Sequence, residues 1–277
     1  MANFYGYRET NHRNEETMAF SILVCIKAVP DLSSGQKLTI DDDRIVQADI
    51  AWCMNSYDAC ALEAALAIKD AQPQITVDAL SAGPEVVRPI IRRAMAMGAD
   101  AGIHLPLEAD ECTSSETVAA TIAHYTEGKN YDLILVGAIS EDLMQGITGP
   151  MIAAALDRPC AAAAMAIDLD CSSKSIDVSC EMEGGMSERI RLALPALVTV
   201  QTGGWQPRYP TLSNTLRSRK ETIQRVEAKR GKADANAIRT LGLAPPPPAS
   251  ACRIIEGTPA EKADMLLSLF NEKGWLK

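Results

Sequence analysis

The first half of the chain alternates continuous apolar runs with amphipathic stretches. Four apolar runs have the length and continuity of strands buried on both faces: 20–29, 75–82, 101–106 and 131–139. Helical periodicity follows each of the first three runs, at 56–70, 83–98 and 113–128, and a fourth helix is expected from Pro150. Four repeats of strand and helix predict an α/β fold with a mostly parallel sheet and helices on both faces.

The boundaries of these helices carry recognisable capping residues. Ser56 is expected to cap the first helix, with Asp58 in its first turn, where the helix dipole favours negative charge. Pro84 is expected at the first position of the second helix, which Pro89 should bend. A capping box at 113–116 is expected to begin the third helix.

After Pro159 the pattern changes to strands without intervening helices. The strand-like segments are 160–169, 175–182, 187–194 and 196–202, and the turn at 183–185 predicts an antiparallel pair. From Trp205 onward the chain is polar, contains prolines at 245–248, and regains a helical pattern only near 261–270. We therefore expect three parts: a disordered or non-native extension (1–17), an α/β domain (18–204) and a C-terminal arm (205–277).

Composition and charge exclude several classes of function. The 277 residues carry a net charge of −9, which argues against a nucleic-acid surface. The longest apolar run, 160–167, is far too short to span a membrane. Eight cysteines form no CxxC pair, and the three histidines are not at ligand spacing from them. We expect free thiols, no metal site and a reducing, cytoplasmic compartment.

The loops after the strands are the candidate site. In a parallel α/β sheet, ligands bind beyond the carboxyl ends of the strands, where the chain order reverses. The loop GAISEDLMQGITGP, 137–150, combines glycines, hydroxyls and amides directly before a helix whose N–H groups can hold a phosphate. It matches neither the P-loop nor GxGxxG. Its adjacent Glu141 and Asp142 fit ribose hydroxyl acceptors or solvated residues, and no Ser–His–Asp, Cys–His or metal constellation can be assembled. The residues thus predict a nucleotide-sized pocket and a binding or electron-carrying role.

Several segments together resemble the β subunit of electron-transfer flavoproteins, from about Ser21 to the C-terminus. They share that family's order and spacing: ILVCIKAVPD, MNSYDACALEAALAIKD, SAGP, RRAMAMGADAGIHL, YDLILVGAISED, EGG, RLALPALVTV and QPRYPTLSN. The resemblance implies a Rossmann-like, adenine-nucleotide-binding domain and an arm that wraps an α subunit holding most of a redox-active FAD. Such a pair takes electrons from flavin dehydrogenases, commonly acyl-CoA dehydrogenases, and the flavin rather than this chain does the chemistry.

The resemblance also implies site residues. Tyr57 would approach the α-subunit flavin, and Leu212 would dock into a groove on client dehydrogenases, although a leucine there is otherwise typical of packing. The nucleotide site would comprise Cys25, Asn55, Ala79, Ala82, Gly137, Ser140, Glu141, Asp142, Gln145, Gly146 and Thr148.

The ligand of this site stays open between two nucleotides. Family members that shuttle electrons hold AMP, whereas bifurcating members hold a second FAD and accept electrons from NADH. The sequence slightly favours FAD over AMP in this site. Asn55 is followed by Ser56 instead of the family's proline, and the loop after Gln145 is two residues longer than usual. The alternative function is a stand-alone adenine-nucleotide sensor of the stress-protein type, which would form homodimers and need no arm.

Overall fold

The computed structural model describes residues 20–31, 33, 40–41, 44–45, 50–109, 111–170, 173–227, 252 and 254–276. The extension expected at 1–17 and the prolines at 245–248 lie outside the described residues. The chain divides into a large unit, 1–39 with 45–241, and a small unit, 40–44 with 242–277. Each unit is described by itself below.

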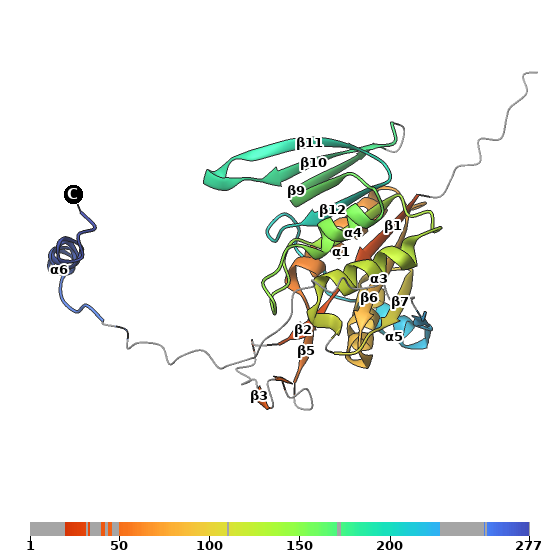
Figure 1. Cartoon of the computed structure of the whole chain (residues 1–277), viewed down its shortest axis with the longest axis horizontal. Coiled ribbons are helices and arrows are strands. Elements are labelled where there is room, and N and C mark those ends of the chain that lie inside the picture. Colours follow the sequence, from red (N-terminus) through yellow and green to blue (C-terminus); the bar gives the residue numbers. More distant parts are fainter. Residues whose placement is uncertain are drawn as a thin grey trace, which may run out of the picture. The chain divides into compact units, whose positions relative to one another are not determined.

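A nine-stranded sheet forms the centre of the large unit, in the order β11-β10-β9-β12-β8-β1-β6-β7-β13 (Figure 1). Five neighbouring strands run parallel: β1 (Ser21–Cys25), β6 (Thr76–Gly83), β7 (Ala101–Pro106), β8 (Leu133–Gly137) and β12 (Ala196–Val200). The chain builds outward from β1 through β6 to β7, then returns to place β8 on the other side of β1. The chain order therefore reverses between β1 and β8, the point where doubly wound sheets bind ligands.

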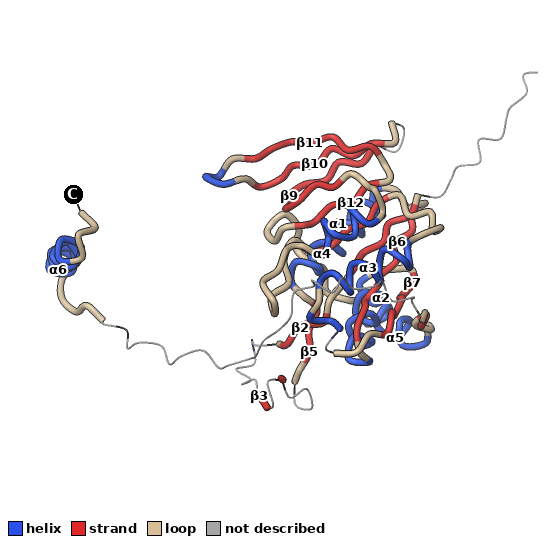
Figure 2. The backbone as a smooth tube through the Cα atoms, viewed as in Figure 1, coloured by secondary structure: helices blue, strands red, loops and turns tan. Residues whose placement is uncertain are grey.

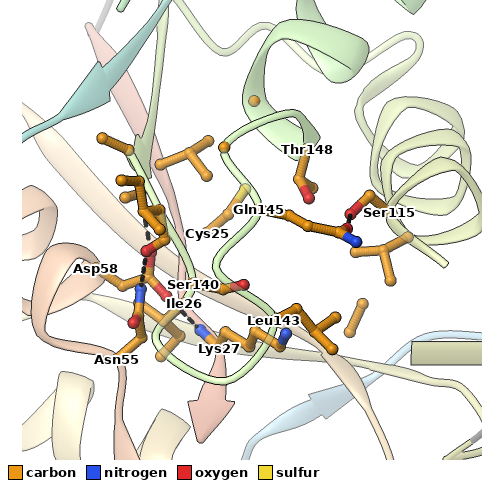
Figure 3. Close-up of a pocket in the computed structure, with 18 of the residues that line it drawn as sticks. Cys25, Ile26, Lys27, Asn55, Asp58, Ser115, Ser140, Leu143, Gln145 and Thr148 are labelled. Atoms are coloured by element: carbon orange, nitrogen blue, oxygen red, sulfur yellow. Dashed lines mark hydrogen bonds between the residues drawn. The ribbon is translucent and has the colours of Figure 1, made fainter. Parts of the chain in front are cut away.

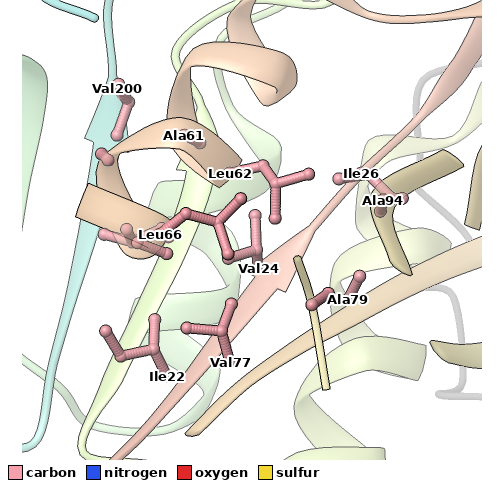
Figure 4. Close-up of a cluster of buried hydrophobic side chains, with 14 of the residues drawn as sticks. Ile22, Val24, Ile26, Ala61, Leu62, Leu66, Val77, Ala79, Ala94 and Val200 are labelled. Carbon is pink, nitrogen blue, oxygen red and sulfur yellow. The ribbon is translucent and has the colours of Figure 1, made fainter. Parts of the chain in front are cut away.

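Helices cover both faces of this sheet. One face carries α1 (Ser56–Ala71) and α2 (Arg88–Met97), and the other carries α3 (Ser115–Thr126) and α4 (Thr148–Ala155). Alternate residues of β1 serve the two faces, since Val24 packs with Leu62 and Leu66 (Figure 4), whereas Leu23 belongs to the cluster of Ile122 on α3. Burial on both faces explains why β1 is apolar from Ile22 to Cys25.

Two proline expectations need correction. Pro84 caps a short 3-10 turn, Glu85–Val87, and α2 begins only at Arg88. Pro89 therefore lies in the first turn of α2 and does not bend it. A proline there costs little, because the first amides of a helix have no intrahelical acceptor in any case.

Two capping expectations are wrong by one residue. Asn55, not Ser56, is the N-cap of α1, and its side chain makes no capping hydrogen bond. Ser114, not Thr113, caps α3, because a 3-10 turn at Glu111–Thr113 precedes it and the Ser114 hydroxyl accepts a hydrogen bond from the Thr117 amide at 3.2 Å.

The predicted antiparallel section is confirmed. β9 (Cys160–Asp170), β10 (Ser175–Glu181) and β11 (Ser187–Ala193) pair antiparallel, and a 3-10 turn at Glu183–Gly185 lies between the last two. β9 runs parallel to β12, which joins this section to the main sheet. A separate antiparallel pair, β2 (Ala28–Pro30) with β5 (Trp52–Met54), flanks the polar excursion after the first strand.

Residues 205–227, at the start of the predicted arm, add two elements to the large unit. α5 (Leu212–Lys220) packs beside α2 (Figure 2), and β13 (Gln224–Arg225) pairs parallel with β7. The basic stretch 217–220 is the last turn of α5, where cations complement the helix dipole.

The remaining elements are short or belong to the small unit. β3 (Ile40–Asp41) and β4 (Arg44–Ile45) form a two-stranded sheet, and α6 (Pro259–Glu272) begins with a capping box between Thr258 and Glu261. Over the described residues, no helix is long and apolar enough to cross a bilayer.

Candidate functional site

A pocket opens at the carboxyl ends of β1 and β8, where the chain order reverses (Figure 3). It encloses about 670 Å³, including space open to solvent. The end of β1, the start of α1, the loop from β8 to α4, and α3 all contribute to its wall. The lining residues are Cys25, Ile26, Lys27, Asn55, Asp58, Ala82, Cys112, Ser115, Val118, Ile122, Val136, Gly137, Ala138, Ile139, Ser140, Leu143, Gln145, Gly146, Thr148 and Gly149.

Asp58, in the first turn of α1, ties the ends of β1 and β8 together. Its carboxylate accepts hydrogen bonds from the backbone amides of Lys27 and Gly137, each at 2.8 Å. The side chain is buried, and this burial raises its pKa to about 7, although both backbone hydrogen bonds act in the opposite direction. A Cβ on Gly137 would lie 2.3 Å from a carboxylate oxygen of Asp58, so this contact requires glycine.

Asn55 fixes the long loop against α1. Its Nδ2 donates to the carbonyl of Ile139 at 2.9 Å, and its Oδ1 accepts from the amide of Glu141 at 3.1 Å. The Glu141 carboxylate in turn accepts a hydrogen bond from the Ser56 amide at 3.1 Å. Asn55 thus holds the loop rather than capping the helix, and a loop residue satisfies one free amide of α1 instead.

Two further contacts hold the same loop. Lys27 forms an ion pair with Asp142 at 2.7 Å, which joins the loop to the end of β1. The Ser115 hydroxyl donates to the side-chain oxygen of Gln145 at 2.7 Å, which joins the loop to α3. The loop is therefore fixed to three separate elements before any ligand enters.

The pocket has one polar wall and one apolar wall. The first intrahelical bond of α4 runs from Met151 to Ile147, so the amides of Thr148 and Gly149 have no helical acceptor. These amides and the Thr148 hydroxyl suit a phosphate group. The opposite wall includes Val118 and Ile122 of α3 together with the Cys25 thiol, whose pKa is raised by burial and by nearby Asp58. Such a neutral, apolar wall suits a flat heterocycle.

The structure brings most of the expected nucleotide residues together. Eight of them line the pocket: Cys25, Asn55, Ala82, Gly137, Ser140, Gln145, Gly146 and Thr148. Glu141 and Asp142 belong to the same loop, but they bond to Ser56 and Lys27 instead of lining the pocket. Ala79 is buried within β6 among the core residues.

Two expected residues lie elsewhere. Tyr57 follows Ser56 on α1, and its Cβ lies 2.7 Å from where a Cβ on Gly137 would be. Leu212 begins α5, is not part of the pocket wall, and is 75% exposed.

Some lining residues were not singled out from the sequence. Ser115, Val118 and Ile122 come from α3, and Asp58 was expected only to complement the helix dipole. The available signal was positional, because α3 is the next helix after β7, a strand that ends at the same edge of the sheet. Among the residues described, no three His, Cys, Asp or Glu side chains cluster as a metal site would require.

The strand order and the pocket at its reversal define a doubly wound α/β protein with a ligand site at the switch point. The electron transfer flavoprotein domain family matches residues 44–230. The electron transfer flavoprotein subunit beta of Mus musculus is 32% identical over 257 residues, covering 91% of this chain and 97% of the mouse protein. That of Bos taurus is 35% identical over 210 residues (74% and 80%), and that of Bacillus subtilis is 28% identical over 243 residues (86% and 93%). The chain belongs to the electron transfer flavoprotein β-subunit family, as its resemblance predicted.

Proposed function

We propose that this chain pairs with an electron transfer flavoprotein α subunit, binds an adenine nucleotide in its pocket, and carries electrons without making or breaking bonds itself. The observation that carries the proposal is the two-walled pocket at the strand reversal, with its fixed loop. Apart from the buried carboxyl group of Asp58, its polar groups are mainly amides, hydroxyls and the Lys27 ammonium, which suit recognition of a nucleotide. The FAD held mainly by the α subunit would supply the redox chemistry.

The proposed nucleotide is AMP or a second FAD. Both contain the adenine, ribose and first phosphate that the apolar wall and the start of α4 would hold. They differ in what lies beyond that phosphate, and a second FAD with NADH as electron donor would define a bifurcating protein.

A cofactor count tests this proposal. The chain is co-expressed with its α subunit, the purified complex is denatured, and the released FAD and AMP are quantified per heterodimer. Two FAD would make this subunit a flavin holder, and one FAD with one AMP would make it a holder of a structural nucleotide. A colourless homodimer that binds ATP would instead support the stand-alone sensor and refute the electron carrier.

We further propose that Leu212 docks flavin dehydrogenases, of which acyl-CoA dehydrogenases are the expected class. Leu212 is 75% exposed, and Tyr209 and Leu216 nearby are 87% and 50% exposed. Exposed apolar side chains in one short segment are typical of an interaction surface.

Replacing Leu212 with Ala tests the docking role. The variant should raise the KM of the dehydrogenase for the heterodimer by about tenfold, as for a binding hot spot, while the flavin content stays unchanged. Steady-state electron transfer from a reduced acyl-CoA dehydrogenase measures this effect. An unchanged KM would discard the role of Leu212.

The compartment that we propose for this chain rests on its cysteines. The seven cysteines in the described part of the chain are free thiols, which supports the cytoplasm or an equivalent reducing interior. The Arabidopsis thaliana relative is described as mitochondrial.

A further inference from the structure

The segment 206–216, here called the docking segment, follows Trp205 and includes the first turns of α5. We propose that Arg208 is the positioning residue of this segment, holding it on α1 in the conformation that presents Leu212 to a dehydrogenase. The inference rests on the docking role proposed for Leu212. Arg208 itself faces α1 and need not touch the partner.

Arg208 and Glu63 form an unusually complete ion pair. The Arg208 Nε and a terminal nitrogen reach the Glu63 carboxylate at 2.8–3.0 Å, and the Arg208 backbone amide donates to the same carboxylate at 3.0 Å. The same terminal nitrogen, Nη2, also donates to the Asp70 carboxylate at 2.7 Å. Among basic side chains, only the planar guanidinium of arginine makes bidentate contacts of this kind.

The burial of Glu63 distinguishes this pair from an ordinary surface ion pair. The Glu63 side chain is 12% exposed and that of Arg208 is 32% exposed. Glu63 lies in the middle of α1, a rigid helix packed on the sheet, and is 145 residues away in sequence. The contact therefore fixes one point of the docking segment, backbone included, to the core of the domain.

The segment is also held on either side of its exposed residues. Before it, the Trp205 carbonyl accepts a hydrogen bond from the Cys60 thiol of α1 at 3.4 Å. After it, Arg92 of α2 donates to the backbone carbonyls of Ser218 and Glu221, and Ser218 is buried. Tyr209 and Leu212 project from a segment fixed at both ends.

Fixing the docking segment in this way has a direct effect on binding. A segment already ordered in the free protein loses little conformational freedom when the partner docks. In Arg208→Ala the backbone amide of residue 208 can still donate to Glu63, but every guanidinium contact with Glu63 and Asp70 is lost. The docking segment would then be held less firmly on α1, and Leu212 would be presented in many orientations.

A double-mutant cycle on the heterodimer tests this inference. Arg208→Ala should raise the KM of a reduced acyl-CoA dehydrogenase for the heterodimer by about tenfold and leave kcat and flavin content unchanged. In the Leu212→Ala background the same substitution should change KM by less than about twofold, because it acts through Leu212. Arg208→Lys, which keeps the charge and loses the two-pronged geometry, should behave like Arg208→Ala.

The matched control is Arg217→Ala. Arg217 lies on α5, and within the described part of the chain its ion pair is with Glu221 four residues later, at 3.6 Å. This variant removes the same charge from the neighbourhood and should leave KM within about twofold. A KM increase from Arg217→Ala equal to that from Arg208→Ala would assign the effect to net charge and overturn the inference.

Hydrogen exchange separates the possible failures. Arg208→Ala should speed amide exchange across 206–216 without changing the protection of α1. Unchanged exchange, or equal KM effects in both Leu212 backgrounds, would overturn the positioning role. If Leu212→Ala alone leaves KM unchanged, the docking function itself fails, and the inference fails with it.

Discussion

At the scale of single residues, Asp58 shows how one carboxyl group can close a sheet at its ligand-binding edge. One carboxyl oxygen accepts a hydrogen bond from the Lys27 amide, just after β1, and the other accepts one from the Gly137 amide at the end of β8. The chain order reverses between these two strands. Burial makes the charged form costly, and the pKa of about 7 reflects that cost. Between pH 3.8, the ordinary pKa of the group, and about pH 7, Asp58 is therefore mostly protonated in the folded protein and mostly ionised in the unfolded chain.

The raised pKa of Asp58 predicts a stability change with pH. Between about pH 4 and pH 7 the folded state binds more protons than the unfolded state, so its stability falls as pH rises through this window. From about pH 5 to about pH 8 the contribution of Asp58 to this fall should be roughly 2–3 kcal/mol, and Asp58→Asn should abolish it. Urea unfolding of the purified protein at both pH values measures the difference.

Two features sharpen this experiment. Asn can accept only one of the two amide hydrogen bonds, so the variant should also lose about 1–3 kcal/mol at acidic pH. Asp168→Asn is the control, because that side chain is 82% exposed and should leave the pH profile intact. Parallel profiles for the Asp58 variant and the unmodified protein would show that Asp58 does not titrate in this range.

At the scale of elements, the loop 138–147 is a preformed part of the site. Asn55 is buried and satisfies one carbonyl and one amide of this loop. The ion pair of Lys27 with Asp142 is the more exposed contact, whereas the Asn55 side chain is itself buried and holds the loop backbone at two points. Asn55 is therefore the contact whose loss should loosen the loop most.

Asn55→Ala should therefore weaken nucleotide retention. We expect about tenfold weaker binding, because a carbonyl and an amide of the loop lose their partner, although the bond of Glu141 with the Ser56 amide remains. The AMP or FAD recovered per purified heterodimer measures the effect, and the exposed Asn130→Ala is a matched control. Full nucleotide content in the Asn55 variant would show that the remaining contacts, from Lys27, Ser115 and Ser56, suffice.

The sequence predicted the elements better than their contacts. Apolar runs identified the parallel strands, since burial on both faces leaves a continuous pattern in β1 and β8. α5 was not predicted, because Leu212 and Leu216 are exposed and its other residues are polar, which leaves no apolar period.

The site was predictable only in outline. The loop 137–150 could be identified because glycines and hydroxyls before a helix are a local pattern. The role of Asp58 could not, because its partners Lys27 and Gly137 lie 31 and 79 residues away. Asn55 was expected in the site only through the family resemblance. Local rules do not separate Asn55 from Ser56 as the N-cap, and the loop that contacts Asn55 is distant in sequence.

At the scale of the whole molecule, α6 predicts how the chain meets its α subunit. Met265, Leu266 and Leu267 on this helix are 42%, 40% and 50% exposed. Within its own unit these apolar residues are exposed, and we expect the proposed α subunit to cover them.

Deleting residues 258–277 should weaken the heterodimer by at least about tenfold in Kd, because the apolar residues of α6 would no longer be buried. Leu267→Asp should reproduce much of the loss, whereas Ser268→Asp on the same helix should not. Analytical ultracentrifugation of the α–β mixture measures Kd, and an unchanged value after deletion would show that α6 takes no part in assembly.

The outer edge of the sheet has a consequence for the behaviour of the protein in solution. β11 ends the nine-stranded sheet and offers seven residues of backbone to any strand that approaches. Glu188, Arg189 and Arg191 are exposed along it, and Asp177 on β10 holds both arginines at 3.1 and 2.7 Å. An approaching apolar strand would have to strip water from these charges, so the edge resists polymerisation. The charges along β11 thus oppose the strand-by-strand addition of other molecules to this sheet, which would produce a fibre.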